Sequence, residues 1–394
     1  MTLPENRVAG FALLPDIQIL HYGTDGLWTC QKVSEFEVCP RCATPSRAIY
    51  DRRWVLIRDE PLRSMPIRLK IHKRRFFCAT CHKPFTEPVA GVLPRRRTTQ
   101  RFRRAVMEAC ERYTDLKRVR EDFQVSYHFL YSAYYERVKL NLREREGAPW
   151  PSAIGIDEHS YGKNRETRST QFVSVIVNHN RKKMFEAVLG KTQAEMEQAT
   201  AHIPGRENVL WATLDLCDPY RNYIRSFFPN AKCVADKFHV LRLLSPALLK
   251  KRKEITGTRA DLKAKRLLLV SAHDLRYGER VALEQFLKRY PVMHELWVWK
   301  ERLHAFYRIK GYGRAYERYK KLMDEMSVSF LPEIQTLRKT LLKWKEEILN
   351  YFQTGLTNAR LEGFNNKASL LKRRAYGYRN PENYRLQLLN ACSR

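Results

Sequence analysis

The sequence lacks any long apolar run and is poor in acidic residues. No hydrophobic stretch approaches the roughly 20 residues that a membrane-spanning helix needs, and no signal peptide opens the chain. The 394 residues include 42 Asp and Glu against 73 Lys and Arg, a formal net charge of +31. Because the basic surplus is spread along the whole chain, we expect a cytoplasmic protein with a polyanion as its partner and no membrane association.

Cysteine is also sparse, and four of the nine cysteines occur in two tight pairs, Cys39 with Cys42 and Cys78 with Cys81. Two C-x-x-C pairs supply four thiolates to one tetrahedral ion, so the sequence predicts a single structural Zn²⁺. The residues between the pairs alternate as strands do, which is typical of a zinc ribbon, here assigned to residues 1–93. The alternative is a pair of redox or unpaired cysteine motifs.

A basic segment and three helices are predicted for residues 94–150, which end in a linker. Thr98 or Thr99, Thr114 and Ser126 can each cap a helix, and a short turn precedes the third. This order is typical of a helix-turn-helix DNA-binding domain, although trihelical bundles without DNA contacts share it. The residues expected to contact DNA, unless the arginines form only a solvated linker, are Arg95, Arg96, Arg97, Arg101, Arg103, Arg104, Tyr127, His128 and Tyr131.

Strands that end in aspartate mark residues 151–239. An apolar run leads to Asp157, and a second buried strand leads to Asp215. Three strands followed by helix–strand–helix–strand is the order of a ribonuclease H-like α/β domain. Ligands gather at strand ends in such a sheet, so we expect Asp157 and Asp215 to face each other. Either aspartate alone would be explained as a turn or helix-capping residue.

Two further aspartates compete with Asp215 for the middle position. Asp218 precedes a proline and is explained by a helix N-cap. Asp236 opens the next helix, where His239, one turn later, would point back toward the site as a supporting or alternative group. Glu158 neighbours Asp157 on a strand and therefore points to the opposite face.

The rest of the chain is predicted to be helical, with an all-α insertion over residues 240–352 and a C-terminal segment over residues 353–394 whose catalytic helix completes the α/β core. Glu362 stands alone in that segment among basic and amide side chains, with Asn358, Asn365 and Asn366 at helical spacing. A solvent-exposed charge is the simpler explanation of Glu362. Three converging carboxylates in a basic protein would instead hold divalent metal ions against a phosphodiester.

The chain resembles the insertion-sequence transposases of the L-three family from about residue 39 to its end, and most specifically in its C-terminal block. The matching motifs are Cys39-x2-Cys42, Cys78-x2-Cys81, Gly155-Ile156-Asp157-Glu158, Asp215…Pro219-Tyr220, Asp236-x2-Phe238-His239-Val240, Leu361-Glu362-Gly363-x-Asn365-Asn366-Lys367 and Arg373-Arg374-Ala375-Tyr376-Gly377-Tyr378.

The resemblance implies a bacterial, nucleoid-associated enzyme that binds the terminal inverted repeats of its element and performs DNA cleavage and strand transfer. It implies Asp157, Asp215 and Glu362 as a triad that holds two Mg²⁺ (or Mn²⁺) ions, and by analogy a homodimer or larger assembly on double-stranded DNA. The residues expected to grip phosphates beside the cut are Lys367, Lys372, Arg373, Arg374 and Arg379. The alternatives are a catalytically silent DNA-binding regulator and a structure-specific nuclease of the same fold.

Overall fold

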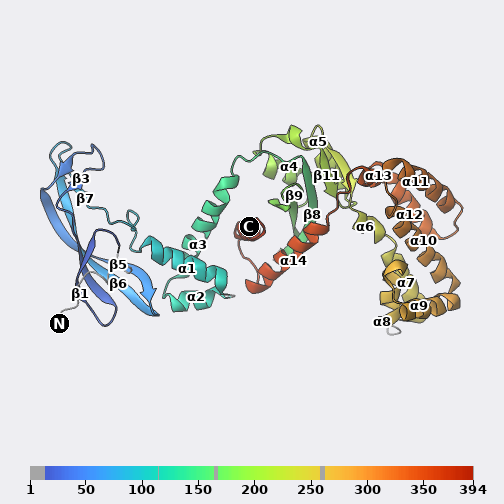
Figure 1. Ribbon diagram of the computed structural model, residues 1–394, viewed down its shortest axis with the longest axis horizontal. Helices are drawn as coiled ribbons and strands as arrows, with labels where there is room; N and C mark the ends of the chain where they lie inside the picture. The colour runs from blue at the N-terminus through green and yellow to red at the C-terminus, as the bar shows by residue number, and fades with distance from the viewer. Residues whose placement is uncertain (1–13, 114, 164–166, 258–261, 394) are drawn as a thin grey trace. The chain divides into compact units, whose positions relative to one another are not determined.

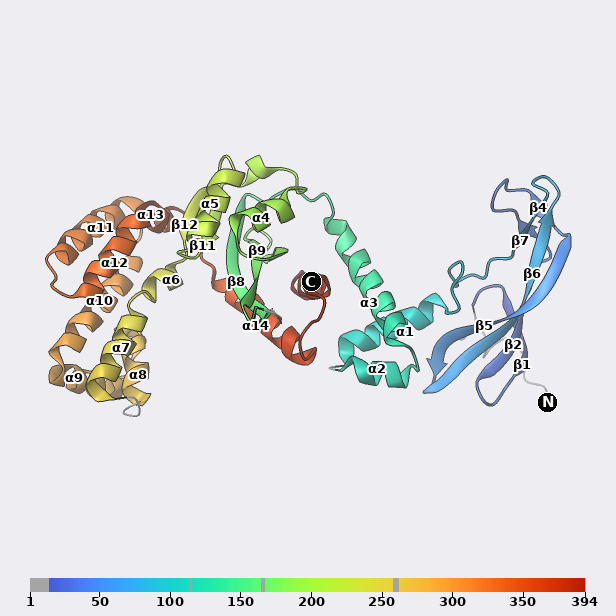
Figure 2. The ribbon, with the colours of Figure 1, turned by 180° about the vertical axis from the view of Figure 1, so that it is seen from behind.

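The structure is a computed structural model that describes residues 14–113, 115–163, 167–257 and 262–393. The chain divides into two compact units, Met1–Asn141 and Leu142–Arg394, and each is described by itself. Figures 1 and 2 show the elements of both units from opposite sides. None of the helices in the described residues is long and apolar enough to cross a membrane.

The first unit contains a five-stranded sheet in the order β1-β2-β6-β5, with β7 paired to β6 (Figure 1). Its strands are β1 (Ile17–Tyr22), β2 (Leu27–Lys32), β5 (Ile49–Leu62), β6 (Met65–Cys78) and β7 (Lys83–Thr86), and a separate pair is formed by β3 (Glu37–Val38) and β4 (Pro45–Ser46). Alternate residues of the β5–β6 hairpin, such as Ile57, Leu69 and Ile71, are buried in the core of this sheet. The hairpin thus supplies the strands predicted between the two cysteine pairs.

Three helices follow this sheet: α1 (Gln100–Arg112), α2 (Leu116–Asp122) and α3 (Tyr127–Leu142). The Thr99 side chain accepts a hydrogen bond from Phe102 N and caps α1. The Ser126 hydroxyl accepts one from Phe129 N at 3.2 Å, at the start of α3. Asp115 caps α2; Thr114, predicted for this role, lies outside the described residues.

The second unit is built on a mixed sheet in the order β10-β9-β8-β11-β12. Its strands are β8 (Ala153–Lys163), β9 (Thr170–Asn178), β10 (Lys183–Leu189), β11 (Trp211–Leu214) and β12 (Lys232–Ala235). β9 pairs antiparallel with both β8 and β10, whereas β11 is parallel to both β8 and β12. The prediction that β8 ends at Asp157 is wrong: its pairing with β9 continues to Lys163, opposite Thr170.

Four helices cover the two faces of this sheet: α4 (Gln193–Thr200), α5 (Asp218–Phe227), α14 (Ala359–Arg374) and α15 (Pro381–Cys392). Val173, Val175 and Val177 of β9 share a buried cluster with residues of α14 and α15. Ile176 belongs to the other cluster, together with Met196 of α4. Because side chains alternate along a strand, β9 is buried on both faces, and α14 is thereby fixed against the sheet.

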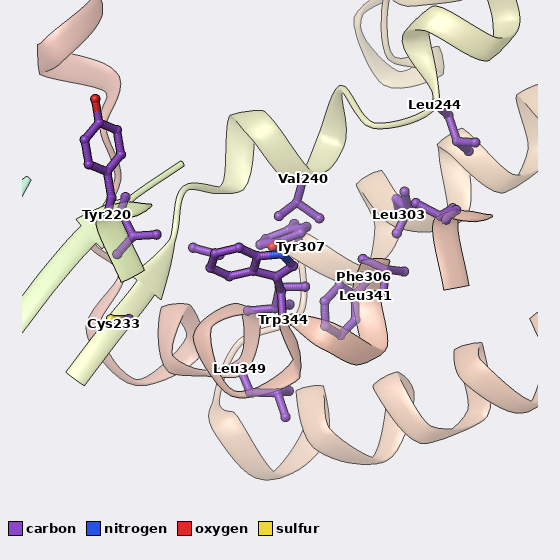
Figure 3. Close-up of a cluster of buried hydrophobic side chains, with 14 of the residues drawn as sticks. Tyr220, Cys233, Val240, Leu244, Leu303, Phe306, Tyr307, Leu341, Trp344 and Leu349 are labelled. Atoms are coloured by element: carbon purple, nitrogen blue, oxygen red, sulfur yellow. The ribbon is translucent and has the colours of Figure 1, made fainter. Parts of the chain in front are cut away.

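The remaining helices form the predicted insertion, in which α13 packs against the edge strand β12. They are α6 (Lys237–Leu241), α7 (Ser245–Thr256), α8 (Leu262–Leu269), α9 (Tyr277–Arg289), α10 (Pro291–Tyr307), α11 (Tyr312–Ser327), α12 (Pro332–Lys343) and α13 (Lys345–Thr354). Figure 3 shows Trp344 among the insertion's apolar side chains, in the cluster that also contains Cys233 of β12. Asn350 of α13 donates a hydrogen bond to the Cys233 carbonyl at 2.8 Å, so insertion and sheet form one core.

Candidate active site and metal centres

The four paired cysteines form one cluster in the first unit. Cys39 follows β3, Cys78 ends β6, and Cys42 and Cys81 lie in the turns that come next. One sulfur atom from each residue lies within 4.8 Å of the other three, and the Cys42 and Cys78 sulfurs are 3.5 Å apart. Four convergent thiolates suit Zn²⁺, which binds such sets tetrahedrally. The predicted ligand set is therefore brought together by the fold.

Strand pairing places three aspartates in a row in the second unit. Thr213 of β11 lies opposite Gly155 of β8, so Asp215 and Asp157, each two positions further along, are neighbours. Asp236 directly follows β12, the strand on the other side of β11. The carboxyl ends of parallel strands are where polar side chains meet in such a sheet. The row is thus a direct consequence of register.

The row carries a concentrated negative charge that His239 of α6 partly offsets. Burial and the neighbouring Asp215 carboxylate raise the pKa of Asp157 to about 7. His239 Nδ1 lies 2.9 Å from Asp215 Oδ1 and 3.1 Å from Asp236 Oδ2. Burial disfavours charge on His239, but these two carboxylates outweigh it and raise its pKa to about 10. Carboxylates crowded in this way are the hard oxygen donors that a divalent cation neutralises.

One carboxylate oxygen of the aspartate row, Oδ1 of Asp215, has no well-aligned hydrogen-bond donor among the described residues. This buried oxygen is nevertheless close to the charged His239 ring. Asp236, only 2% exposed, accepts from Asn358 N at 2.9 Å and faces His239. These contacts favour Asp215 over Asp236 as the ligand available to a metal, and they give Asp236 a supporting contact to the start of α14.

Asn358 joins the start of α14 to the sheet through a buried network. Its Nδ2 donates to the Ile156 carbonyl at 2.9 Å, and its Oδ1 accepts from the Thr213 hydroxyl. The same hydroxyl lies 2.7 Å from His179 Nε2. A side chain at Gly155 would meet all three of these polar groups at 2.8–2.9 Å. Glycine is therefore required at position 155 because the network occupies the space of a Cβ atom.

Glu362 lies on α14 between two residues that contact the aspartate row. Asn358 precedes it by four positions, and Asn365 follows by three and donates to Asp157 Oδ2 at 2.8 Å. Residues at this spacing share one helix face, so the exposed Glu362 side chain is on the face that α14 turns to the site. Among the described residues, the acidic group whose ligand atoms lie within 4.8 Å of one another is Asp215, Asp236 and His239, so the convergence of Glu362 with Asp157 and Asp215 stays a prediction.

Two carboxylates near the row are engaged elsewhere. Glu158 accepts a hydrogen bond from the Tyr220 hydroxyl at 2.8 Å, in agreement with its predicted position on the opposite face. Asp218 is the first residue of α5 rather than its N-cap, which is Cys217. Its carboxylate pairs with Arg221 at 2.7 Å and with Lys343 at 2.5 Å.

Several predicted DNA contacts have internal partners. Arg101 forms an ion pair with Asp59, which is 2% exposed, and Arg103 pairs with Glu136. On α14, Lys367 donates to the Ala391 carbonyl at 3.2 Å, and Lys372 donates to the Ser160 carbonyl. Arg374 is half-buried. The exposed members of the predicted set are Arg95, Arg96, Arg97, Arg104, Tyr127, His128, Tyr131, Lys367, Arg373 and Arg379.

The functional residues that sequence reasoning did not assign are the amides and hydroxyl that position α14. Asn358 and Asn365 were visible as polar neighbours of Glu362 at helical spacing, which is the signal that could have assigned them. Thr213 carried no signal, because a threonine in a buried strand is ordinary. Only the register of β8 and β11 brings it to Asn358.

A four-thiolate ribbon, a row of aspartates on a mixed sheet and a basic chain are the features of a DNA-processing enzyme of the DDE transposase class. Residues 154–388 match the model of the ISL3-type DDE transposases, described as a transposase, and residues 35–81 match the zinc finger of the IS204/IS1001/IS1096/IS1165 transposases. Because the first match covers more than half of the chain, the protein belongs to the ISL3 family of transposases, and its N-terminal cysteine cluster is the family's zinc ribbon. A transposase for insertion sequence element IS1001 from Bordetella parapertussis is 21% identical over 364 residues, 89% of this chain and 87% of the relative.

Proposed function

We propose that this transposase cleaves DNA at the ends of its insertion sequence and joins the freed ends to target DNA, with Asp157, Asp215 and Glu362 as the metal-holding triad. The observation that carries the proposal is the attachment of α14 to the aspartate row by Asn358 and Asn365, with Glu362 between them. The strand order of the sheet supports a ribonuclease H-like fold for this unit, interrupted by the helical insertion.

The triad suits two divalent cations, Mg²⁺ or Mn²⁺, because its donors are carboxylate oxygens and Asp157 and Asp215 repel each other without a cation. When bound, the ions would activate the attacking oxygen and stabilise the leaving 3′ oxygen of a phosphodiester. The chain's own residues contribute positioning. Asn365 orients the Asp157 carboxylate by a hydrogen bond, His239 contacts the Asp236 carboxylate, and Asp236 accepts a hydrogen bond from Asn358 N at the start of α14.

DNA recognition is assigned to the first unit and to the end of α14. The three helices after the zinc ribbon support a helix-turn-helix that binds terminal inverted repeats, with the exposed Tyr127, His128 and Tyr131 at the start of its third helix. Exposed arginines before α1 and after α14 are suited to phosphate contacts, whose strength falls as salt rises. Two ends must meet during transposition, so a homodimer or larger assembly on DNA is part of the proposal.

The test is the variant Glu362→Gln, assayed with Mg²⁺ on duplex DNA that carries one terminal inverted repeat. We expect strand cleavage to fall below detection while end binding stays within twofold of the parent, because the amide keeps the size of the side chain and removes the anionic ligand. Glu346→Gln, an exposed glutamate on α13, is the matched control and should cleave normally. Persistent nicking by the Glu362→Gln protein would show that the triad is wrongly assigned.

Two other functions give different results when the assay also includes a branched DNA without an inverted repeat. A catalytically silent regulator would bind ends but release no product from either protein. A structure-specific nuclease would cut branched DNA without an inverted repeat and form no joined product. The crowded carboxylates of Asp157 and Asp215 favour the enzyme over the regulator, because a binding module gains nothing from burying two anions side by side.

A further inference from the structure

The end of α14 holds an aromatic side chain in an unfavourable backbone conformation. Tyr376 N donates to the Arg373 carbonyl at 3.2 Å and Gly377 N to the Lys372 carbonyl at 3.0 Å, the two bonds of a Schellman helix end. The residue of this motif that must adopt a left-handed backbone conformation is Tyr376, with φ 50°, and glycine is the usual residue at such a position. Among the described residues with positive φ, it is the only Phe, Tyr or Trp.

The turn that carries Tyr376 is anchored on both sides. Before it, Lys372 donates to a backbone carbonyl of β8. After it, the Tyr378 carbonyl accepts a hydrogen bond from the Tyr161 hydroxyl at 2.6 Å, and the Tyr378 ring lies 5.1 Å from the Tyr384 ring. Asn380 then caps α15 by accepting from Glu382 N at 2.9 Å. In the sequence Tyr376-Gly377-Tyr378, the Tyr378 ring therefore packs against the protein, whereas the Tyr376 ring is exposed to solvent.

Tyr376 itself is 92% exposed, although burial of its ring would stabilise the protein. The exposed arginines Arg373 and Arg379 lie on either side of it in the chain, and neither forms an ion pair within the described residues. Nothing in the packing requires an aromatic residue here, and backbone geometry disfavours one. An exposed ring on a fixed backbone turn, with exposed arginines before and after it in the chain, has the chemistry that recognises a nucleic-acid base.

We propose that Tyr376 is a base-stacking residue that holds an unpaired or extruded base of the DNA bound along α14. The inference rests on the proposed function, which places the DNA at Glu362 of the same helix. At 1.5 Å per residue, the end of α14 lies roughly 20 Å from Glu362. Since duplex DNA rises about 3.4 Å per base pair, the stacked base lies about six base pairs from the cleaved phosphodiester.

The experiment measures DNA affinity without divalent metal, so that cleavage plays no part. The full-length protein is titrated onto duplexes that carry the terminal inverted repeat with a single 2-aminopurine at each of the first ten positions. The variants are Tyr376→Gly, Tyr376→Ala and Tyr376→Trp. Tyr277→Ala is the matched control, because Tyr277 of α9 is 85% exposed and lies in the insertion.

We expect Tyr376→Gly to melt at the same temperature or higher, because glycine suits a positive φ, yet to bind the DNA about tenfold more weakly. Tyr376→Ala should lose affinity equally, Tyr376→Trp should keep it, and the 2-aminopurine signal near position six should change with the parent and not with Tyr376→Gly. Affinity equal to that of Tyr277→Ala, or a parallel loss of stability and affinity, would overturn the inference.

These outcomes are separable from those of the proposed function. If Glu362→Gln still cleaves, the triad fails whatever Tyr376 does. If Glu362→Gln is inactive and the Tyr376 variants bind DNA as the parent does, the stacking role alone fails.

Discussion

The two candidate metal centres are assembled in opposite ways. The zinc centre takes its four ligands from two local pairs, Cys39 with Cys42 and Cys78 with Cys81, and each pair forms within one turn. The proposed acidic centre would take its ligands from separate strands and a helix, at chain separations of 215 − 157 = 58 and 362 − 215 = 147 residues. The zinc centre can therefore be predicted from the spacing of cysteines in the sequence, whereas the acidic centre depends on strand register and on the packing of α14.

The two centres also differ in how they relate to stability. Structural zinc contributes its binding free energy to folding, because the unfolded chain offers no preformed site. The acidic row works against folding when no cation is bound, since Asp157 and Asp215 repel each other in a buried setting. The polar network around Asn358 holds this unfavourable arrangement in place. Three variants test this contrast.

The largest effect is expected from Cys78→Ser. Losing one thiolate should reduce bound zinc from one ion per chain to none and remove on the order of 10 kcal/mol of metal-coupled stability, so that β3, β4 and β7 unfold. Metal analysis and hydrogen exchange check this, with Cys217→Ser as the control outside the cluster. The unit from Leu142 to Arg394 should keep its hydrogen-exchange protection. Loss of protection in both units would contradict the view that the zinc centre stabilises only the first unit.

An intermediate effect is expected from Asn358→Ala. Asn358 is 5% exposed, and its removal takes away the hydrogen bond to the Ile156 carbonyl and one of the partners of the buried Thr213 hydroxyl, which keeps His179 Nε2. We expect the free energy of unfolding of the second unit to fall by about 2–4 kcal/mol, measured by urea denaturation. Asn366→Ala, an exposed amide on the same helix, should change it by less than about 0.5 kcal/mol. Equal effects of the two variants would mean that the network does not hold α14.

The smallest effect is expected from Asp218→Asn. Its carboxylate is 45% exposed and pairs with Arg221 and Lys343, so its loss should cost only about 0–1 kcal/mol. DNA cleavage should continue at the parent rate, whereas Asp215→Asn, three positions earlier, should abolish it. Measuring the DNA cleavage rate of both variants distinguishes the surface ion pair expected at Asp218 from the metal ligand proposed at Asp215. An inactive Asp218→Asn protein with normal stability would move the middle ligand to Asp218.

Local chemistry in the sequence was sufficient for much of the fold. The helix starts at Thr99 and Ser126, the alternation of β9 and the helical insertion all follow from hydrogen-bonding groups and apolar spacing within a few residues. The wrong strand end at Asp157 has an equally local cause. A carboxylate was taken as the end of a buried strand, but the pairing with β9 continues beyond Asp157 as far as Lys163.

The sequence by itself determined the zinc ligands and the candidate carboxylates, because a thiolate pair or an aspartate after an apolar run carries its chemistry in the residue type. Only the tertiary structure decided that Asp215 lies beside Asp157, that Asp236 and His239 brace the row, and that Tyr376 projects while Tyr378 packs inward. Those outcomes depend on which strands are neighbours in the sheet and on how segments distant in the sequence pack together, and neither can be read from a local stretch of sequence.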